Sequence, residues 1–339
     1  MTVRKVRELG DASGPGRLDP ALYSAATDSR GNVLVASGLR RPVSVFGPDG
    51  RFLRTLGDSV AADSLAPVFR LATVGRGDTV HLVDDRNLRR LVLGPDFHPV
   101  RSVATSPFAL NSGMALLLPD DGMLLTGIIR TRENIGYPLH LAGRGGEIVR
   151  SFGTDAPEDT PESEINYRRL AHAGPGRAWS GHMTRYVLER WTLDGRRELR
   201  IERDAPWFAP YADVRRLSPA DPPRPMLMAV RQDAAGRLWT VVRVADPQWR
   251  RTVPSRSDTA SRAPLTRPDT GLDDLYDTVV EVFDPACGRL LASERLPAFM
   301  IGFLDDEHLL EWRVNGAAPP RLGVWRVGLN LPSGRRTTC

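Results

Sequence analysis

Residues 28–57 read DSRGNVLVASGLRRPVSVFGPDGRFLRTLG, in which short apolar runs are joined by glycine-centred turns. Val33 and Val35, and again Val43 and Val45, recur at a spacing of two residues. That period is typical of β-strands, because alternate side chains of a strand point to opposite faces of its sheet. The glycine in each turn can adopt the positive φ that tight hairpins require. The stretch therefore predicts a small antiparallel sheet.

The first turn of this unit returns along the whole chain. It recurs as Gly75-Arg76-Gly77-Asp78, Asp120-Asp121-Gly122, Gly174-Pro175-Gly176, Ala234-Ala235-Gly236 and, without its glycine, Asp305-Asp306-Glu307. A period of roughly 45 residues that holds four strands is typical of a propeller blade, which buries its faces only by stacking on neighbouring blades. The original and five returns predict an all-β, six-bladed β-propeller with four-stranded blades, forming one domain over residues 1–332 with a tail at 333–339.

The last predicted blade is one strand short. The blades are predicted at residues 23–56, 69–104, 115–152, 168–201, 226–296 with an insertion at 245–277, and 299–327. The segment Val3–Leu9 precedes the first blade and belongs to no blade of its own. We expect it to be the outer strand of the last blade, because closing the ring buries two blade faces and removes an exposed edge. Leu9 and Val6 are expected to be more buried than Arg7 and Lys5.

The charge of the chain indicates no particular partner. Its 46 basic residues include one lysine, Lys5, and therefore 45 arginines, and the net charge is +5. The arginines are spread along the chain among 41 acidic residues. A GC-rich genome explains this arginine skew more simply than selection for phosphate, so we expect no nucleic-acid binding. Cys287 and Cys339 match no metal motif, and both a disulfide between them and two free thiols stay open.

The sequence contains no run of 18 apolar residues, which predicts no transmembrane helix. The charged start at residues 1–5 has no apolar run behind it, so we expect no secretory signal in this sequence.

The first repeat resembles a known family. Leu9-Gly10-Asp11, the turn at residues 28–32 and the segment Phe46-Gly47-Pro48-Asp49-Gly50 together look like an NHL-type repeat. The whole chain is similar to bacterial six-bladed propeller proteins of undefined function that carry such repeats, although later blades match only through turns and endings such as Phe283-Asp284-Pro285. The resemblance implies export to the periplasm or outside the cell. The absence of a visible signal leaves the compartment open.

Long connections gather on one predicted face of the ring. In a propeller, the turns between strands one and two and between strands three and four lie on one face, here called the turn face. The other connections lie on the opposite face, here called the long-loop face, and they include residues 10–22, 58–68, 128–137, 154–167, 181–187, 203–225 and 245–277. Binding residues tend to lie on loops that a rigid scaffold positions. We therefore predict that ligand contact is confined to the long-loop face.

Candidate binding residues on that face combine arginine, acidic and aromatic side chains, as interface anchors and anion clamps do. They are Arg40, Arg41, Asp84, Asp85, Arg86, Arg130, Arg132, His182, Arg185, Arg243, Trp249 and Arg250. The alternative is that they are solvated residues paired with nearby carboxylates. The insertion at 245–277 is interpreted as a lid or as a disordered segment, and its end at 271–276 is expected to form a helical turn that docks on the face.

The sequence contains few residues in the patterns that propeller enzymes use for catalysis. Propeller lactonases hold calcium with carboxylates at the channel, whereas the predicted inner strands begin with Tyr23, Phe69, Ala115, Arg168, Met226 and Phe299. A zinc site like that of propeller lyases needs converging histidines, and only His172 and His182 are placed to approach each other. We therefore expect no metal and no cofactor.

The leading hypothesis is a monomeric, non-enzymatic binding or scaffold propeller that presents its long-loop face to a protein, peptide or glycan. The alternative is a propeller hydrolase or lyase with residues at the channel mouth. Clustering of Asp84, Asp85, His182 and Arg243 would favour the enzyme.

Overall fold

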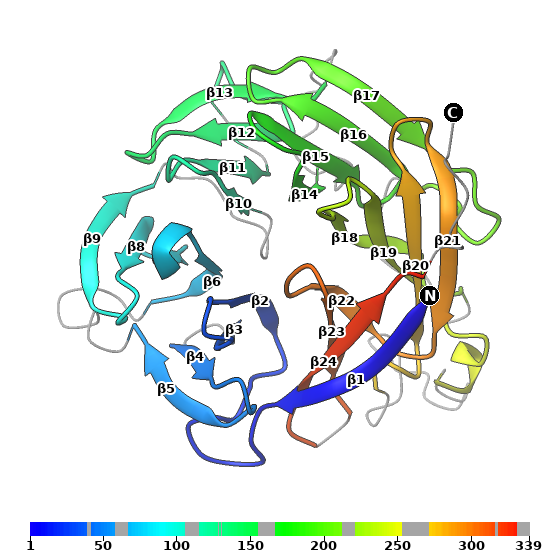
Figure 1. Cartoon of the computed structure of the whole chain (residues 1–339), viewed down its shortest axis with the longest axis horizontal. Coiled ribbons are helices and arrows are strands. Elements are labelled where there is room, and N and C mark those ends of the chain that lie inside the picture. The colour runs from blue at the N-terminus through cyan, green and yellow to red at the C-terminus, as the bar shows by residue number, and fades with distance from the viewer. Residues whose placement is uncertain are drawn as a thin grey trace, which may run out of the picture.

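Six antiparallel sheets surround a central axis in the computed structural model (Figure 1). It describes residues 1–38, 42–57, 67–105, 115–127, 129, 131–154, 167–211, 221–252, 271–315 and 318–330. Each sheet has four strands, and five of them follow sequence order from the centre of the ring to its rim. The chain is therefore an all-β, six-bladed β-propeller, as the repeat predicts. Within the described part of the chain, no helix is long and apolar enough to span a membrane.

The strand bounds match the predicted blades closely. Blades 1 to 3 contain β2 (Leu22–Thr27), β3 (Val33–Ser37), β4 (Val43–Phe46), β5 (Phe52–Leu56), β6 (Phe69–Val74), β7 (Val80–Asp84), β8 (Arg89–Leu93), β9 (Pro99–Ala104), β10 (Ala115–Leu117), β11 (Met123–Thr126), β12 (Leu139–Ala142) and β13 (Ile148–Phe152). Blades 4 to 6 contain β14 (Arg168–His172), β15 (Arg177–His182), β16 (Val187–Thr192), β17 (Arg197–Glu202), β18 (Met226–Gln232), β19 (Leu238–Ala245), β20 (Tyr276–Asp284), β21 (Arg289–Leu296), β22 (Met300–Phe303), β23 (His308–Arg313) and β24 (Arg321–Gly328). Short 3₁₀ turns, η2 (Arg76–Asp78) and η4 (Trp249–Thr252), interrupt the connections.

The N-terminal strand β1 (Thr2–Leu9) completes the sixth blade. It pairs antiparallel with β24, from Thr2 opposite Gly328 to Leu9 opposite Leu322. Blade 6 thus has the strand order β22-β23-β24-β1 from the centre outward, and the first and last segments of the chain share one sheet (Figure 1). This is the closure that the missing strand predicts.

One burial expectation for β1 is wrong. Leu9 is fully buried, but Val6 is 42 % exposed, whereas Arg7 is partly buried. The register with β24 shifts between Lys5 and Arg7, so Val6 is an extra residue in a β-bulge. A bulge changes which side chains face inward, and the simple alternation of the sequence cannot show it.

The apolar core is divided among the junctions between blades. Val33 and Val35 pack in the cluster shared with blade 6, whereas Leu34 and Ala36 pack in the cluster shared with blade 2. Similar clusters join each of the other consecutive pairs of blades. Every inner blade surface is therefore covered by the next blade, which explains why β3 is buried on both sides and why the ring must close.

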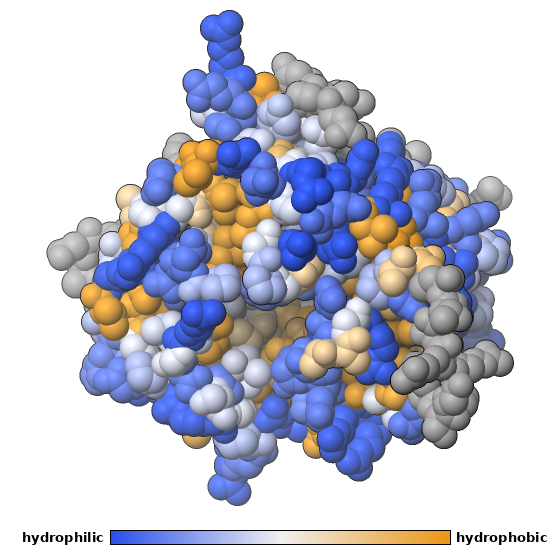
Figure 2. All heavy atoms as spheres, turned by 45° about the horizontal axis from the view of Figure 1, so that its top comes forward, coloured by the Kyte–Doolittle hydropathy of each residue, from blue (hydrophilic) through white to orange (hydrophobic). Residues whose placement is uncertain are grey.

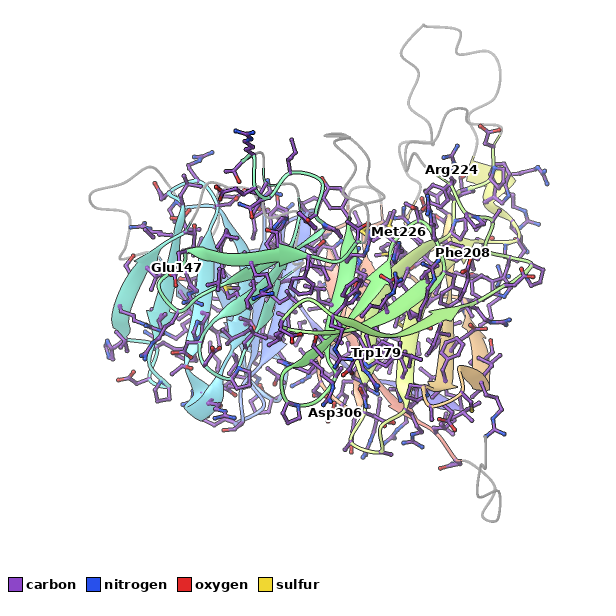
Figure 3. The ribbon with its side chains drawn as sticks, turned by 90° about the horizontal axis from the view of Figure 1, so that it is seen from above. Glu147, Trp179, Phe208, Arg224, Met226 and Asp306 are labelled. Carbon is purple, nitrogen blue, oxygen red and sulfur yellow. The ribbon has the colours of Figure 1, made fainter. Side chains whose placement is uncertain are left out.

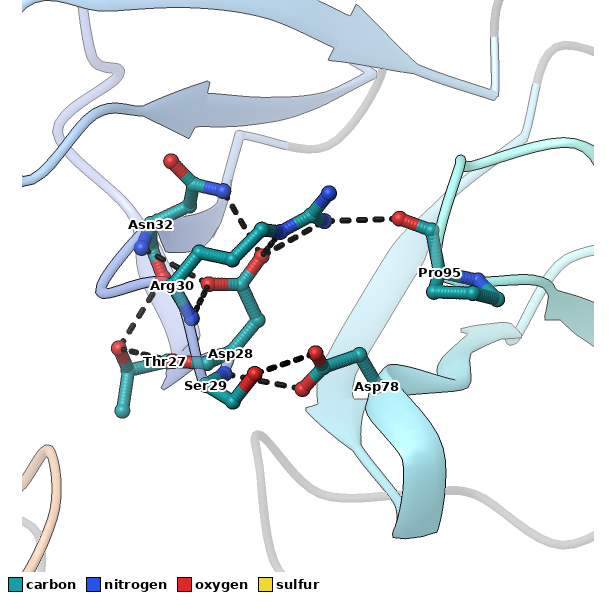
Figure 4. Close-up of polar contacts among 7 residues, drawn as sticks. All are labelled: Thr27, Asp28, Ser29, Arg30, Asn32, Asp78 and Pro95. Carbon is teal, nitrogen blue, oxygen red and sulfur yellow. Dashed lines mark hydrogen bonds and ion pairs between the residues drawn. The ribbon is translucent and has the colours of Figure 1, made fainter.

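Side chains on the turn face join each blade to the next. Figure 4 shows the contact between blades 1 and 2, where the Asp78 carboxylate accepts hydrogen bonds from the backbone N–H and the hydroxyl of Ser29. In the same contact, the Arg30 guanidinium bonds to Asp28 and donates to the carbonyl oxygen of Pro95 at 2.7 Å. Because these residues belong to two different sheets, the contact fixes the blades relative to each other.

A donor of this kind occurs at every junction of the ring, and five of the six donors are arginines. In ring order they are Arg7 to Pro48 O (2.9 Å), Arg30 to Pro95 O (2.7 Å), Arg90 to Asp121 O (2.7 Å), Arg150 to Asp194 O (2.7 Å), Trp179 to Gln232 Oε1 (2.7 Å) and Arg231 to Asp305 O (2.7 Å). We call these contacts the junction clasps. Part of the arginine content of the chain therefore has a structural role.

Replacing Arg90 with methionine should lower the free energy of unfolding by about 2–4 kcal/mol, because a buried side chain loses two hydrogen bonds that join blades 2 and 3. Arg90 is 1 % exposed and donates to the carbonyl oxygens of Asp121 and Arg144. Urea denaturation measures the change. The matched control Arg51→Met, at a side chain that is 87 % exposed, should shift stability by no more than about 0.5 kcal/mol. Equal effects of the two substitutions would contradict a role for the clasp.

The turn between β20 and β21 contains Cys287, which is disulfide-bonded. Cys339 lies outside the described residues.

Candidate functional site

A cavity of about 520 Å³ lies at the centre of the ring. All six inner strands or the residues just before them contribute to its wall, through side chains that include Tyr23, Leu71, Ala115, Leu170, Met228 and Phe299. Figure 2 shows that the surface of the molecule is hollowed at its centre and that hydrophobic residues lie within the hollow. The cavity is thus a shared product of the six blades. Most of its lining residues are apolar, but polar atoms, many of them in the backbone, form a comparable share of its surface.

The lining is offset from the predicted one by one or two residues on three strands, with Leu71, Arg169 and Met228 in place of Phe69, Arg168 and Met226. Tyr23, Ala115 and Phe299 line the cavity as expected. Phe69 and Met226 are instead buried between blades, with exposed fractions of 1 % and 6 %. Their strands supply the cavity wall with residues further along the chain.

Bulges near the start of four inner strands account for much of this offset. The register of the inner hairpin shifts beside Tyr23, Arg70, Met228 and Ile301. Three of these four residues, all but Arg70, line the cavity. A bulge re-aims a side chain and is frequent next to binding sites. The repetition of the bulge at one level of the ring therefore shapes the cavity.

Among the described residues that line this cavity, Arg169 is the one with a charged side chain. It lies near the start of β14, and its Nε donates to the carbonyl oxygen of Leu227 in blade 5 at 3.3 Å. No carboxylate among the described residues forms an ion pair with it. Burial lowers the pKa of Arg169 to about 10, and the charge of Arg243 contributes to this lowering. Arg169 still carries its charge at neutral pH, so the cavity wall is cationic at this point.

Arg243 lies beside the same junction, near the end of β19. Its guanidinium stacks over the ring of Tyr276 at 4.8 Å, and Tyr276 in turn contacts the Phe299 ring at 5.5 Å between centroids. Its buried Nε has no hydrogen-bond partner among the described residues. Arg243, which the sequence analysis singled out, therefore sits behind the aromatic part of the cavity wall.

Other arginines around the cavity have carboxylate partners. Arg70 stacks over Tyr23 at 4.9 Å and donates to Asp85 at 3.1 Å. Asp84 is fully buried and accepts hydrogen bonds from the Val68 backbone and from Arg89, so it holds the start and end of its hairpin together. The predicted Asp84 and Asp85 thus have structural partners within blade 2.

His182 is buried and lies near the end of β15, where its Nε2 is 3.2 Å from Glu189 Oε2. Burial lowers the pKa of His182 to about 4, although Glu189 acts in the opposite direction. The second predicted histidine, His172, pairs with Ala178 at the other end of the same hairpin, so the two histidines are not brought together. Nothing in the described contacts joins Asp84, Asp85, His182 and Arg243 into one cluster.

The remaining predicted residues divide into three groups. Arg86, Arg132, Arg185 and Arg250 are exposed. Trp249 is 5 % exposed and lies in η4, so its ring is mostly covered. Arg40, Arg41 and Arg130 lie outside the described residues.

The described ends of the 245–277 insertion are ordered by hydrogen bonds. The backbone N–H of Tyr276 donates to the carbonyl oxygen of Leu272 at 2.9 Å, which forms the expected turn. The Asp273 carboxylate accepts from the backbone N–H of Phe299 at 3.0 Å and so attaches this turn to the cavity wall. Residues 253–270, on which the choice between lid and disorder depends, lie outside the described part.

The two faces of the disc are visible in Figure 3, where Arg224 and Met226 lie toward one face and Asp306 lies at the other. Arg169 and Arg243 belong to the end of the blades where β18 starts, which is the long-loop face. Sequence reasoning missed Arg169. The available signal was a pair of adjacent arginines, Arg168 and Arg169, at the start of an inner strand. Among the described residues, no group of three His, Cys, Asp or Glu side chains is arranged to hold a metal ion.

No protein-family model matches the chain, and no curated protein matches it in sequence. The NHL-type resemblance is therefore not confirmed. Solved structures do resemble it. A DUF4221 family member from Bacteroides vulgatus superposes with a TM-score of 0.63 at 8 % identity, over 96 % of this chain and 98 % of that chain.

Two further structures give the same picture. A putative exported protein from Bacteroides fragilis has a TM-score of 0.56 at 8 % identity, with 96 % of each chain covered. Virginiamycin B lyase from Staphylococcus aureus has a TM-score of 0.52 at 10 % identity, over 96 % of this chain and 99 % of that chain. At these identities the likeness shows the six-bladed propeller fold alone.

Proposed function

We propose that this protein is a non-enzymatic binding propeller that receives a protein or peptide partner on its long-loop face, with an apolar side chain of the partner seated in the central cavity. The observation that carries the proposal is the central cavity of about 520 Å³, which all six blades line, mostly with apolar side chains. Concave apolar sites with a few polar groups are the usual form of ligand pockets.

The side chains of the wall, rather than its backbone polar groups, favour a peptide over a glycan. A glycan presents many hydroxyl groups, and each of them needs a hydrogen-bond partner when it is buried. The side chains that line the cavity offer few polar groups, namely Ser24, Thr73 and Arg169 together with ring N–H and O–H groups. Burying an aliphatic or aromatic side chain against Leu, Ile, Met and Phe instead lowers the free energy of binding.

Filling the cavity should abolish this binding without unfolding the ring. A Cβ added at Gly302, which lines the cavity, would meet Ala229 Cβ at an ordinary 3.6 Å, so Gly302→Leu is expected to project into the space. Peptides selected from a displayed random library on the unmodified protein should lose at least about tenfold in affinity for Gly302→Leu, which corresponds to 1.4 kcal/mol.

Isothermal titration calorimetry measures the affinities, and circular dichroism shows that the variant is folded. Val149→Leu, which adds the same side chain at a position on the rim that is 60 % exposed, is the matched control and should bind like the unmodified protein. Selected peptides that bind both variants equally would place the partner elsewhere, and the cavity proposal would then be wrong.

A further inference from the structure

Two guanidinium groups at the junction of blades 4 and 5 have no anionic partner among the described residues. Arg169 lines the cavity, and Arg243 lies near enough for its charge to act on Arg169. No ion pair with either side chain is found in the described part of the chain. Two like charges that are held close together and partly removed from water raise the electrostatic free energy of the folded protein. An anion that binds between or beside them lowers it again.

Several arginines elsewhere in the molecule pair with carboxylates, whereas the more buried Arg90 and Arg231 donate to backbone carbonyl oxygens. Arg203 donates to both carboxylate oxygens of Glu281, and Arg295 donates to Asp277 at 2.6 Å. Arg70 has its partner in Asp85. Arg169 differs from the paired arginines because no carboxylate among the described residues forms an ion pair with it, and it differs from Arg90 and Arg231 because it lines the cavity, where an anionic ligand can reach it.

The surroundings define the chemistry of that anion. One side of the site is Arg169, whose Nε is already engaged by the Leu227 carbonyl, which leaves its terminal nitrogens for a ligand. The other sides are apolar, with Leu170, Met228 and Phe299 on the same cavity wall. A planar guanidinium matches the two oxygens of a carboxylate, and the apolar wall matches a hydrocarbon or aromatic body attached to it.

We infer that the central cavity is a carboxylate-binding site in which Arg169, supported by Arg243, binds the carboxylate of a ligand whose apolar body occupies the rest of the cavity. This inference rests on the proposed function and deepens it. The carboxylate belongs either to the end or acidic side chain of a peptide or to a free aliphatic or aromatic acid.

Two dyes that share one aromatic body test the inference. 8-Anilinonaphthalene-1-sulfonate carries an anionic group, which stands in for the carboxylate, whereas N-phenyl-1-naphthylamine is neutral. Fluorescence titration should show that the unmodified protein binds both dyes and binds the anionic one more tightly. Arg169→Met should weaken the anionic dye by at least about tenfold, the usual scale for losing a hydrogen bond to a charged group, and should leave the neutral dye unchanged. Arg243→Met should weaken the anionic dye less.

The control Arg51→Met removes the same charge at an exposed position of the turn face and should change neither affinity. If Arg169→Met binds the anionic dye at full affinity and also binds the neutral dye, the carboxylate site is wrong. The cavity would still be a binding site. Binding of neither dye to the unmodified protein would count against the proposed function itself.

Displacement of the anionic dye then distinguishes the two sources of the carboxylate. The competitors are N-acetyl-Leu-Phe with a free carboxylate, the same dipeptide as its amide, and octanoate. Displacement by the dipeptide acid and not by its amide supports a peptide. Displacement by octanoate alone supports the carboxylate site but contradicts a peptide partner, and displacement by none of the acids contradicts the carboxylate site.

Discussion

Deleting residues 1–9 should lower the melting temperature by more than about 10 °C, because the loss of β1 opens the ring. The deletion removes the outer strand of blade 6 and leaves β24 with an unpaired edge. It also removes Leu9, which is fully buried among side chains of blades 6 and 1, and a large apolar side chain in such a place contributes about 2–5 kcal/mol. The clasp from Arg7 to Pro48 is lost as well. Differential scanning calorimetry measures the change.

Two comparisons make this prediction specific to closure. Leu9→Ala should show part of the loss, whereas Val6→Ala should show little, since Val6 is the exposed residue of the bulge. A synthetic peptide of residues 1–9 added to the shortened chain should restore stability by strand addition, provided that the shortened chain is soluble. A native melting temperature in the deletion variant would contradict the closure model.

Acid should destabilise the protein steeply between about pH 6.5 and pH 4. His81, His140 and His182 are buried on strands of three different blades. Burial lowers the pKa of each to about 4. For His81 the nearby Arg90 lowers it further, and neither ring nitrogen has a hydrogen-bond partner among the described residues.

The direction of the effect follows from proton binding. Below about pH 6.5 the unfolded chain binds protons on these histidines, whereas the folded protein binds them only near pH 4. Acid therefore lowers the free energy of the unfolded state relative to the folded state across this window, and the stability of the protein falls. Each histidine accounts for a loss on the order of 3 kcal/mol by pH 4, and the contribution of the three is fully present above about pH 6.5.

Chemical denaturation at a series of pH values between 4.5 and 8 measures this dependence. His81→Phe replaces one titrating ring with an apolar ring of similar shape, so stability should depend less steeply on pH between 6.5 and 4.5. His98→Phe, at an exposed position on the turn face, is the control and should leave the slope as it is. A stability that does not change between pH 6.5 and 4.5 would show that the buried histidines are not neutral in the folded state.

The sequence predicted on which face of the ring much of the candidate site lies, but it did not predict which side chains contact each other there. Arg243 was predicted on the long-loop face, and the structure puts it behind the cavity wall. Asp85 was predicted there too, and it forms an ion pair with Arg70. Arg169 was missed, because its significance lies in its place in the cavity wall without an ion pair among the described residues, and both depend on residues of other blades. A cluster of four predicted residues would have indicated catalysis, but each contacts different partners: Asp84, Asp85, His182 and Arg243.

The sequence by itself determined the blades, their number and the closing strand. These depend on local features: the period of two in runs such as residues 33–36, the positive φ that Gly31 and Gly50 supply, and the turn spacing. Tertiary structure alone decided the bulge at Val6, the cavity lining and the junction clasps. The Arg30 clasp joins residues 65 positions apart, and the Arg7 clasp joins residues 41 apart. Periodicity reports only which face a side chain lies on, whereas a partner on a neighbouring blade is set by how the sheets stack around the ring.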